Sequence, residues 1–236
     1  MKIAVIVPFY NEEENLVFFI KEWESFLSHR KKLRSDLFFY FIDDGSTDKS
    51  IEIIKKNSKS IHFTIVKKKN SGHGDTCKFG YTLIVRKNNI FDYLLQIDSD
   101  NQCDPKYIVN MHNLILNKKY NFIFGYRKYR GDGNLRFLIS RIMSVVFFIK
   151  KFCYIKDLNT PYRIMKVTDL KEVLLSINKN KNYSDIRLFN CLLSYSIQKK
   201  YKINWININF RDRYFGKSKF SFRTMLSMFF NFIIKI

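Results

Sequence analysis

Residues 3–16 read IAVIVPFYNEEENL, an uninterrupted apolar run that passes into a polar, acidic segment. A continuous apolar run of this kind is typical of a strand that is buried on both faces of a sheet. The stretch from Asn11 to Glu14 then supplies a helix cap and an acidic first turn, which predicts a helix that extends to about Leu27. The chain therefore begins with a buried strand that leads directly into a helix.

The same unit of strand and helix recurs along the first half of the chain. Further apolar strands are expected over residues 37–42, 61–66 and 93–97, with helical segments between them. This alternation implies right-handed crossovers and a mostly parallel sheet flanked by helices, which is an α/β fold. Ligands of such sheets bind outside the carboxyl ends of the strands.

Polar clusters follow three of the expected strands, at residues 8–12, 43–46 and 98–102. In the last cluster, DSDNQ, three side chains with oxygen atoms stand at alternate positions, which share a face in extended backbone. Carboxylate and amide oxygens are hard ligands that suit Mg²⁺ or Mn²⁺ and leave coordination positions for diphosphate oxygens. A solvated acidic turn before Pro105 is the alternative. We expect the three clusters to converge on one crevice.

Two adjacent carboxylates, Asp43 and Asp44, end the second strand. Burying them is costly without donors such as ribose hydroxyls or base N–H groups, which points to a nucleoside contact, although an ordinary strand-to-helix turn is the alternative. The glycine-rich stretch 71–74 is not a dinucleotide-binding loop, because the G-x-G-x-x-G pattern fails at Cys77.

The composition is strongly basic, with a formal net charge of +21 over 236 residues. Such a charge indicates a polyanionic partner, namely nucleic acid, anionic lipid or a phosphate-bearing substrate, unless it only reflects a genome-wide bias toward lysine. The four cysteines are widely spaced, so neither a zinc site nor a disulfide framework is indicated, and a reducing cytosol is expected. No apolar run approaches the roughly 20 residues that a spanning helix needs.

Several motifs in consistent order resemble glycosyltransferase family 2, of the GT-A fold, and within it the polyprenyl-phosphate sugar transferases. The resemblance runs from Ile3 to about Phe220 and rests on VIVPFYNEEENL, FIDDGSTDKS, NSGHGDTCKFGY, LLQIDSDNQCDP, GYRKYRGDGNLRFLISR, DLNTPYRIM and RYFGKSKF. It implies a GT-A glycosyltransferase domain over residues 1–220, with residues 221–236 as an apolar C-terminal helix at a membrane interface.

The resemblance also implies roles for individual side chains. The nucleotide base and ribose would be held by Pro8, Tyr10, Glu12, Ile42 and Asp44. A Mg²⁺ or Mn²⁺ ion would be coordinated by Asp98, Asp100 and Gln102. Donor and acceptor phosphates would be gripped by Arg127, Arg136 and Ser140. A late basic loop with Arg213 and Lys219 would close over the diphosphate of a nucleotide-diphospho-sugar.

The implied reaction is an inverting displacement at the anomeric carbon of the sugar. A polyprenyl phosphate acceptor is already ionised near neutral pH, so it needs no general base, and catalysis would consist of charge stabilisation and alignment. A hydroxyl acceptor on a glycan or a lipid-linked saccharide is the alternative, and it would need a carboxylate base. Asp185 is the candidate for that base, and Asp157 is a weaker one.

A peripheral position at the cytoplasmic face of a membrane agrees with these motifs. In a helix from about Asn134, Arg136 and Ser140 share one face, and the segment 225–236 is apolar with a narrow polar stripe, which suits a membrane interface. Packing against a protein partner is the alternative, and a homo-oligomer stays open. A nucleic-acid-binding module is disfavoured because no RNP-type or helix-turn-helix pattern occurs. A catalytically inactive scaffold is disfavoured by Asp98, Asp100 and Arg213.

Overall fold

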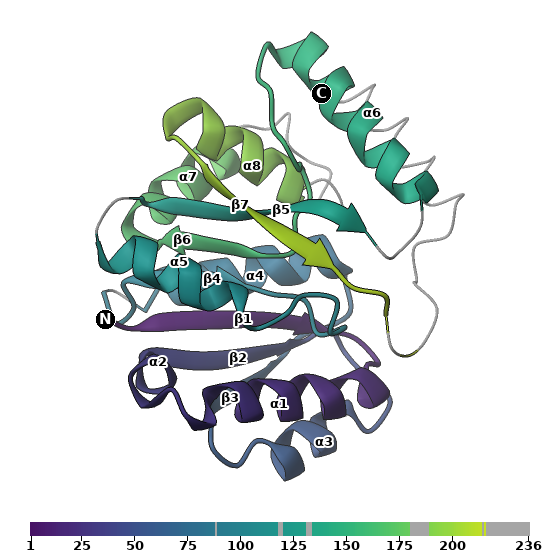
Figure 1. Ribbon diagram of the computed structural model, residues 1–236, viewed down its shortest axis with the longest axis vertical. Helices are drawn as coiled ribbons and strands as arrows, with labels where there is room; N and C mark the ends of the chain where they lie inside the picture. Colours follow the sequence, from purple (N-terminus) through teal and green to yellow (C-terminus); the bar gives the residue numbers. More distant parts are fainter. Residues whose placement is uncertain (88, 118–119, 131–133, 180–188, 214, 216–236) are drawn as a thin grey trace.

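The computed structural model describes residues 1–87, 89–117, 120–130, 134–179, 189–213 and 215. Within these residues a seven-stranded sheet in the order β3-β2-β1-β4-β6-β5-β7 is covered by helices on both faces (Figure 1). Strand β6 is antiparallel to both of its neighbours, and the other pairs are parallel. The expected α/β fold with a mostly parallel sheet is therefore confirmed.

The strands are β1 (Ile3–Phe9), β2 (Leu37–Asp43), β3 (His62–Lys67), β4 (Tyr93–Gln96), β5 (Phe122–Arg130), β6 (Arg163–Lys166) and β7 (Asn204–Phe210). The helices are α1 (Glu13–Ser28), α2 (Lys31–Asp36), α3 (Ser50–Asn57), α4 (His73–Val85), α5 (Tyr107–Leu116), α6 (Asn134–Lys151), α7 (Val167–Lys179) and α8 (Phe189–Lys200). The four strands expected from the sequence all form, each within two residues of its predicted limits. Buried apolar runs identify them because both faces of these strands are covered.

The core lies on both faces of the sheet. On one face α1 packs against β2, with the ring centroids of Trp23 and Phe39 5.3 Å apart. On the other face α4 lies directly against β1, because a Cβ atom on Gly80 would stand only 2.8 Å from Cγ2 of Ile6. Glycine at this position lets the helix approach the sheet closely, and this approach fixes where the N-terminus of α4 meets the strand ends.

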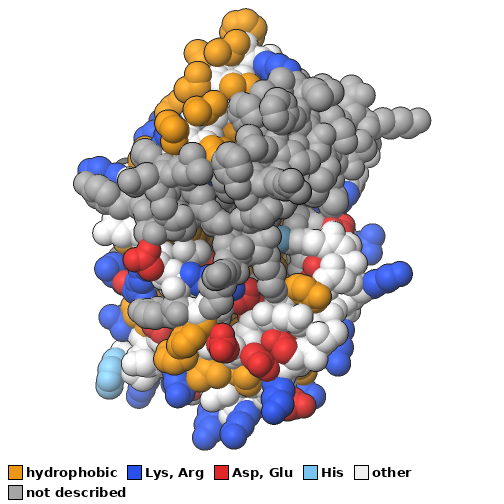
Figure 2. Space-filling view, turned by 90° about the vertical axis from the view of Figure 1, so that its right-hand side faces the viewer, with side chains coloured by type: hydrophobic (Ala, Val, Ile, Leu, Met, Phe, Trp, Pro, Cys, Tyr) orange, Lys and Arg blue, Asp and Glu red, His pale blue; other side chains and the backbone are white. Residues whose placement is uncertain are grey.

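Helix α6 stands apart from these layers (Figure 1). Its inner side packs through Phe147 into a small third cluster with Ile155 and Leu192. Its outer side exposes a stripe of apolar side chains at helical spacing: Leu138, Ile142, Val145 and Ile149, continued by Phe152 after the helix. Hydrophobic side chains accordingly gather at the top of the molecule in Figure 2. Across the described residues, no helix combines the length and apolar character needed to cross a bilayer.

The predicted division into a domain over residues 1–220 and a C-terminal helix over residues 221–236 stays a prediction. Residues 216–236 lie outside the described part of the chain, and so does Lys219.

Candidate active site

The loops that follow β1 and β2 are joined by hydrogen bonds between side chains and backbone. Oδ1 of Asn11 accepts from the backbone N–H of Thr47 at 2.8 Å, and the backbone N–H of Asn11 donates to Oγ of Ser46 at 3.0 Å. The Glu12 amide donates to Oγ of Ser50 at 2.9 Å. Asn11 has a φ of 50°, a conformation that asparagine tolerates better than most residues. The N-cap of α1 is Glu12, so Asn11 connects two loops instead of capping the helix.

Asp44 organises the loop that leads into α4. Its carboxylate accepts from Nζ of Lys68 at 2.7 Å and from the amides of Ser71 and Gly72 at 3.0 and 2.9 Å. Burial alone would raise the pKa of Asp44, but these hydrogen bonds hold that pKa below its ordinary value. The donors that a buried carboxylate requires are thus supplied by the protein itself. The burial of Asp44 therefore does not by itself require a ribose or a base, and a nucleoside contact by Asp44 stays a prediction.

Asp98 and Asp100 follow β4 and lie close enough to influence each other's charge. Burial, the neighbouring carboxylate of Asp98 and the charge of Glu12 raise the pKa of Asp100, whereas the charge of Arg213 and a hydrogen bond from the Gln102 amide lower it. The net result is a pKa of about 7. Oδ1 of Asp98 accepts from Nε2 of Gln96 at 3.0 Å. The loop after β1, the loop after β4 and the segment after β7 therefore meet in one electrostatic cluster, and hydrogen bonds join the loop after β2 to the loop after β1.

Two nearby carboxylates fit a Mg²⁺ or Mn²⁺ ion, which proteins commonly hold through one or two carboxylates together with substrate phosphates. Gln102, the third predicted ligand, is buried, and its Nε2 donates to the carbonyl of Arg211 at 2.9 Å. Among the described residues no group of three or more histidine, cysteine, aspartate or glutamate side chains forms a closed metal cage. The donor set thus suits an ion completed by a diphosphate, and the ligand role of Gln102 stays a prediction.

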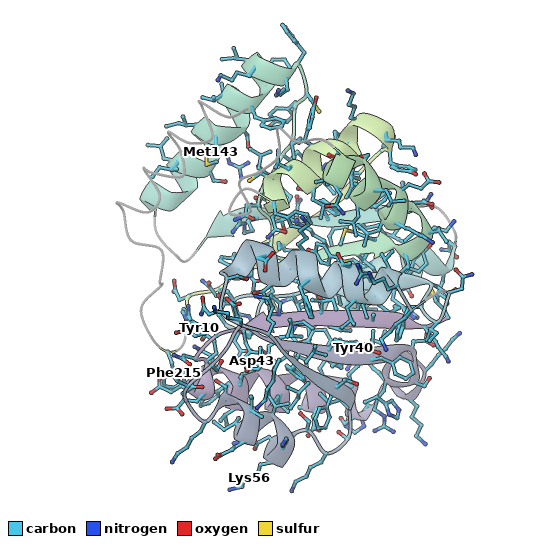
Figure 3. The ribbon with its side chains drawn as sticks, turned by 180° about the vertical axis from the view of Figure 1, so that it is seen from behind. Tyr10, Tyr40, Asp43, Lys56, Met143 and Phe215 are labelled. Carbon is cyan, nitrogen blue, oxygen red and sulfur yellow. The ribbon has the colours of Figure 1, made fainter. Side chains whose placement is uncertain are left out.

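The segment after β7 closes on the loop after β1. Arg213 forms an ion pair with Glu12, and its Nε donates to the carbonyl of Phe215 at 2.8 Å. The ring of Phe215 stacks on Phe18 of α1 with centroids 5.0 Å apart. Figure 3 shows Phe215 at the end of the sheet where Tyr10 lies. Arg213 therefore lies beside Glu12, a predicted nucleotide-binding residue. Two other predicted nucleotide-binding residues, Pro8 and Ile42, are buried and pair with each other in the register of β1 and β2.

Arg127 is held in a buried ion pair. Its Nε and Nη2 donate to the two oxygens of Asp157 at 2.7 and 2.8 Å, and Nη2 also donates to the carbonyl of Asn159 at 3.0 Å. A bidentate pair of this kind is a strong and directional contact. The contact of Arg127 with a phosphate stays a prediction. In this conformation Nε and Nη2 of its guanidinium are both bonded to Asp157. The same pair engages Asp157, the weaker candidate for a base.

The remaining acceptor residues are only partly described. Ser140 is half-buried on α6, and its carbonyl accepts from Oγ of Ser144 at 3.2 Å. Arg136 lies in the first turn of α6, but its side chain is outside the described part of the chain, and so is the whole of Asp185. The structure therefore leaves their roles as predictions.

Sequence reasoning missed His73, Gln96 and Arg163. Nε2 of His73 lies 3.6 Å from Oδ1 of Asp98, and Gln96 hydrogen-bonds the same oxygen. A polar residue inside the apolar run of β4 was an available signal for Gln96, because buried strands seldom carry unpaired amides. Nothing comparable marks Arg163, which the sequence suggests to be one more basic surface residue.

The comparisons with known proteins agree with this geometry. The family profile described as "Glycosyl transferase family 2" matches residues 4–186. The chain is 24% identical over 235 residues to the undecaprenyl-phosphate 4-deoxy-4-formamido-L-arabinose transferase of Photorhabdus laumondii, covering 98% of this chain and 67% of that protein.

Two solved structures share the fold. Glucosyl-3-phosphoglycerate synthase from Mycobacterium tuberculosis, in complex with Mn²⁺ and uridine-diphosphate-glucose, gives a TM-score of 0.61 at 17% identity and covers 99% of this chain and 78% of that one. TarS 1-349 from S. aureus, in complex with UDP-GlcNAc, gives a TM-score of 0.58 at 19% identity and covers 96% and 61%. At these identities the likeness concerns the fold alone.

Proposed function

The chain belongs to glycosyl transferase family 2 and is a glycosyltransferase of the GT-A fold, and we propose that it transfers a sugar from a nucleotide-diphospho-sugar to a polyprenyl phosphate. The observation that carries the donor half of this proposal is the cluster of Asp98, Asp100, Glu12 and Arg213 at the carboxyl ends of the strands. Ligands of open α/β sheets bind at this position. A mixed cluster of acids and a guanidinium suits a diphosphate that arrives with a cation.

The donor site combines preformed loops with a charged rim. Asp98 and Asp100 would hold a Mg²⁺ or Mn²⁺ ion, which when bound supplies charge neutralisation for the departing nucleotide diphosphate. Arg213 lies within reach of the same cluster, and in this conformation its guanidinium is paired with Glu12. We infer that Arg213 exchanges Glu12 for a diphosphate oxygen when the donor binds, because a doubly charged diphosphate is the stronger partner for a guanidinium.

The acceptor half rests on the likeness to undecaprenyl-phosphate transferases, which extends over 98% of this chain. The oxygen of a lipid phosphate is ionised near neutral pH, so it can attack the anomeric carbon without losing a proton. The chain's own residues would then bind, align and stabilise charge, with Arg136 and Ser140 nearest to the acceptor. A hydroxyl acceptor with Asp185 as the base is the outcome that would replace this reaction.

A screen of donors and acceptors tests this function directly. Purified protein would be incubated with Mn²⁺ or Mg²⁺ and a panel of nucleotide-diphospho-sugars, with and without a short polyprenyl phosphate. The expected result is sugar transfer that requires both the cation and the lipid phosphate. Transfer only to a saccharide hydroxyl would replace the acceptor, whereas equal transfer in EDTA would remove the metal ion from the mechanism.

We also propose that the protein binds peripherally to an anionic membrane surface through α6. Its outer stripe is apolar, and the basic residues Lys150 and Lys151 end the helix. Buried apolar area and attraction between basic side chains and anionic lipid together determine how strongly such a helix binds.

Flotation with anionic vesicles at low salt tests membrane binding. The double substitution Val145→Ser with Ile149→Ser should reduce the fraction of protein that floats, because it removes apolar area from the stripe. Leu175→Ser on α7 is the matched control, because Leu175 is also exposed but lies outside the stripe. Equal flotation of the double variant and the control would argue against α6 as the contact, and no flotation of the wild type would argue against membrane binding.

A further inference from the structure

A row of buried polar side chains connects Asp98 to the core between β4 and α4. The Tyr81 hydroxyl donates to Oε1 of Gln96 at 2.8 Å, and Nε2 of Gln96 donates to Oδ1 of Asp98 at 3.0 Å. Both Gln96 and Tyr81 are fully buried. The hydroxyl needs an acceptor, which is the amide oxygen, so the amide NH₂ group must point to the carboxylate. Tyr81 therefore sets the orientation of the group that holds Asp98.

Arg163 lies opposite Gln96 in the register of β4 and β6. It is fully buried, its Nη1 donates to Oδ1 of Asn190 at 3.1 Å, and its guanidinium faces the ring of Phe124 at 5.4 Å. Among the described residues no carboxylate lies within 4.0 Å of it, and its Nε has no hydrogen-bond partner there. Burial raises the pKa of the Tyr81 hydroxyl well above its ordinary value, although the charge of Arg163 and a hydrogen bond from it lower that pKa. The hydroxyl thus stays protonated and can donate to Gln96.

A second series of contacts, from α8 through α4, also reaches Asp98. Nδ2 of Asn190 donates to Sγ of Cys77 at 3.7 Å, and that sulfur lies 3.5 Å from Nε2 of His73. His73 in turn lies 3.6 Å from Oδ1 of Asp98, the oxygen that Gln96 also contacts. Within the described part of the chain, no hydrogen bond reaches the other oxygen, Oδ2.

We propose that Gln96 and Tyr81, supported by Arg163, are positioning residues that hold the Asp98 carboxylate by Oδ1 and leave Oδ2 to coordinate the divalent cation. This inference rests on the proposed function for the role of the cation, but the positioning itself is a property of the protein. Partners of metal ligands that lie one contact further out orient the ligands, and removing them typically weakens metal binding about 10- to 100-fold.

A purely structural role is the competing explanation. In that case the row only satisfies polar groups that the sheet happens to bury, and its loss would lower stability without moving Asp98. Arg163 does not decide between the two explanations, because Asn190 and Leu158 accept hydrogen bonds from its guanidinium in either case. Arg163 itself is a poor test residue, since removing it would also break its contact with Asn190 in α8.

The substitution Tyr81→Phe tests the proposal with the smallest change, since it removes one hydroxyl and keeps the ring. The expected result is a crystal structure in which the Gln96 amide turns and Asp98 leaves its position. Mn²⁺ binding to the full chain, measured by electron paramagnetic resonance without nucleotide, should weaken about 10- to 100-fold. Tyr40→Phe is the matched control, because Tyr40 is a buried tyrosine of the same core cluster. Figure 3 places it far along the sheet from Tyr10.

Each outcome decides between the two roles. An unmoved Asp98 in Tyr81→Phe overturns the proposal, whatever the Mn²⁺ affinity. If Asp98 is displaced in Tyr81→Phe but the wild-type protein binds no Mn²⁺, Gln96 and Tyr81 still position Asp98. The divalent cation is then removed from the proposed function. If Tyr81→Phe does not fold, Gln96→Met removes the hydrogen bond to Asp98 from the strand side and faces the same criteria.

Discussion

The loops after β1 and β2 and the region around β5 and α6 both surround the candidate site, but they hold their charged groups differently. In the first region the carboxylate of Asp44 is satisfied by backbone amides and one lysine, and Asn11 joins two loops through amide contacts. In the second region Arg127 is satisfied by the opposite charge of Asp157 in a buried bidentate pair.

This difference determines what a substitution does. Asp100 sits at the rim of the first region with a charge that the folded protein disfavours, so removing that charge should affect function and leave the fold intact. Removing one member of a buried ion pair leaves the other charge without a partner, so in the second region stability should fail first. Substitutions near β4 should therefore impair activity in a folded protein, whereas substitutions near β5 should first lower the stability of the fold.

The largest effect is expected for Asp100→Asn. It removes one of two carboxylates for a divalent cation whose stabilisation is worth several kcal/mol, so transfer should fall by about 10³-fold. Initial rates on the best donor and acceptor would measure this. Retention of full activity would remove Asp100 from the site.

The same variant also carries a pH test. The folded pKa of Asp100, about 7, lies above the ordinary value of 3.8, so the stability due to its protonated form is lost as the pH rises toward and through 7. Asparagine cannot ionise, so the melting temperature of Asp100→Asn relative to wild type should be higher at pH 8 than at pH 5. Each kcal/mol corresponds to about 2–4 °C for a chain of this size. A drop in melting temperature at pH 8 would contradict the assignment of a disfavoured charge.

The second effect is on stability. Arg127→Ala should lower the free energy of unfolding by about 3–5 kcal/mol, because it removes the guanidinium that donates to both oxygens of the buried Asp157 carboxylate. The double variant Arg127→Met with Asp157→Leu should recover most of this loss, since two apolar groups need no partner. Urea denaturation measures both, and Lys200→Ala in the exposed pair with Glu172 should change little. A stable but inactive Arg127→Ala would instead support the grip on a phosphate.

The third effect separates the two acceptors, and it concerns residues beyond the described side chains. With a lipid phosphate, Arg136→Ala should lose a charge-assisted contact worth about 1.5–3 kcal/mol, or about one to two decades in rate. Asp185→Asn should retain most activity because no proton must leave the nucleophile. With a hydroxyl acceptor the order reverses, since loss of a general base costs about two to four decades. Initial rates of both variants on one donor and acceptor decide the matter.

The smallest effect is expected for Asp44→Asn, which should cost about 1–3 kcal/mol near neutral pH through weaker hydrogen bonds to the loop before α4. The folded pKa of Asp44 is below its ordinary value, so its contribution to stability is present above pH 4 and is lost as the pH falls through the folded pKa. The difference between wild type and variant should therefore shrink in acid. Thermal melts from pH 7 to pH 3 would show it, with the exposed Asp92→Asn as control. A constant difference would mean that the charge of Asp44 is not what orders the loop.

The strands of the first half and the polar clusters that follow them can be predicted from local sequence alone. The apolar run over residues 3–7 is a local signal, because a strand covered on both faces admits few polar residues. Once parallel strands are expected, their carboxyl ends must meet at one edge, so the neighbourhood of Glu12 and Asp98 followed without any structure. The protein groups that donate to Asp44 could not be identified in the same way, because Lys68 stands 24 residues further along the chain.

Which arginines are buried depends on contacts between segments that are far apart in the chain. In the sequence Arg127 is expected to contact a phosphate and Arg163 to be a basic surface residue. The fold instead inserts β6 antiparallel between β4 and β5, which places Arg163 opposite Gln96 in the register and draws Arg127 to Asp157, 30 residues further along. Whether a guanidinium faces solvent or a carboxylate depends on such long-range neighbours. The local sequence does not reveal them, because the same arginine side chain occurs in both environments.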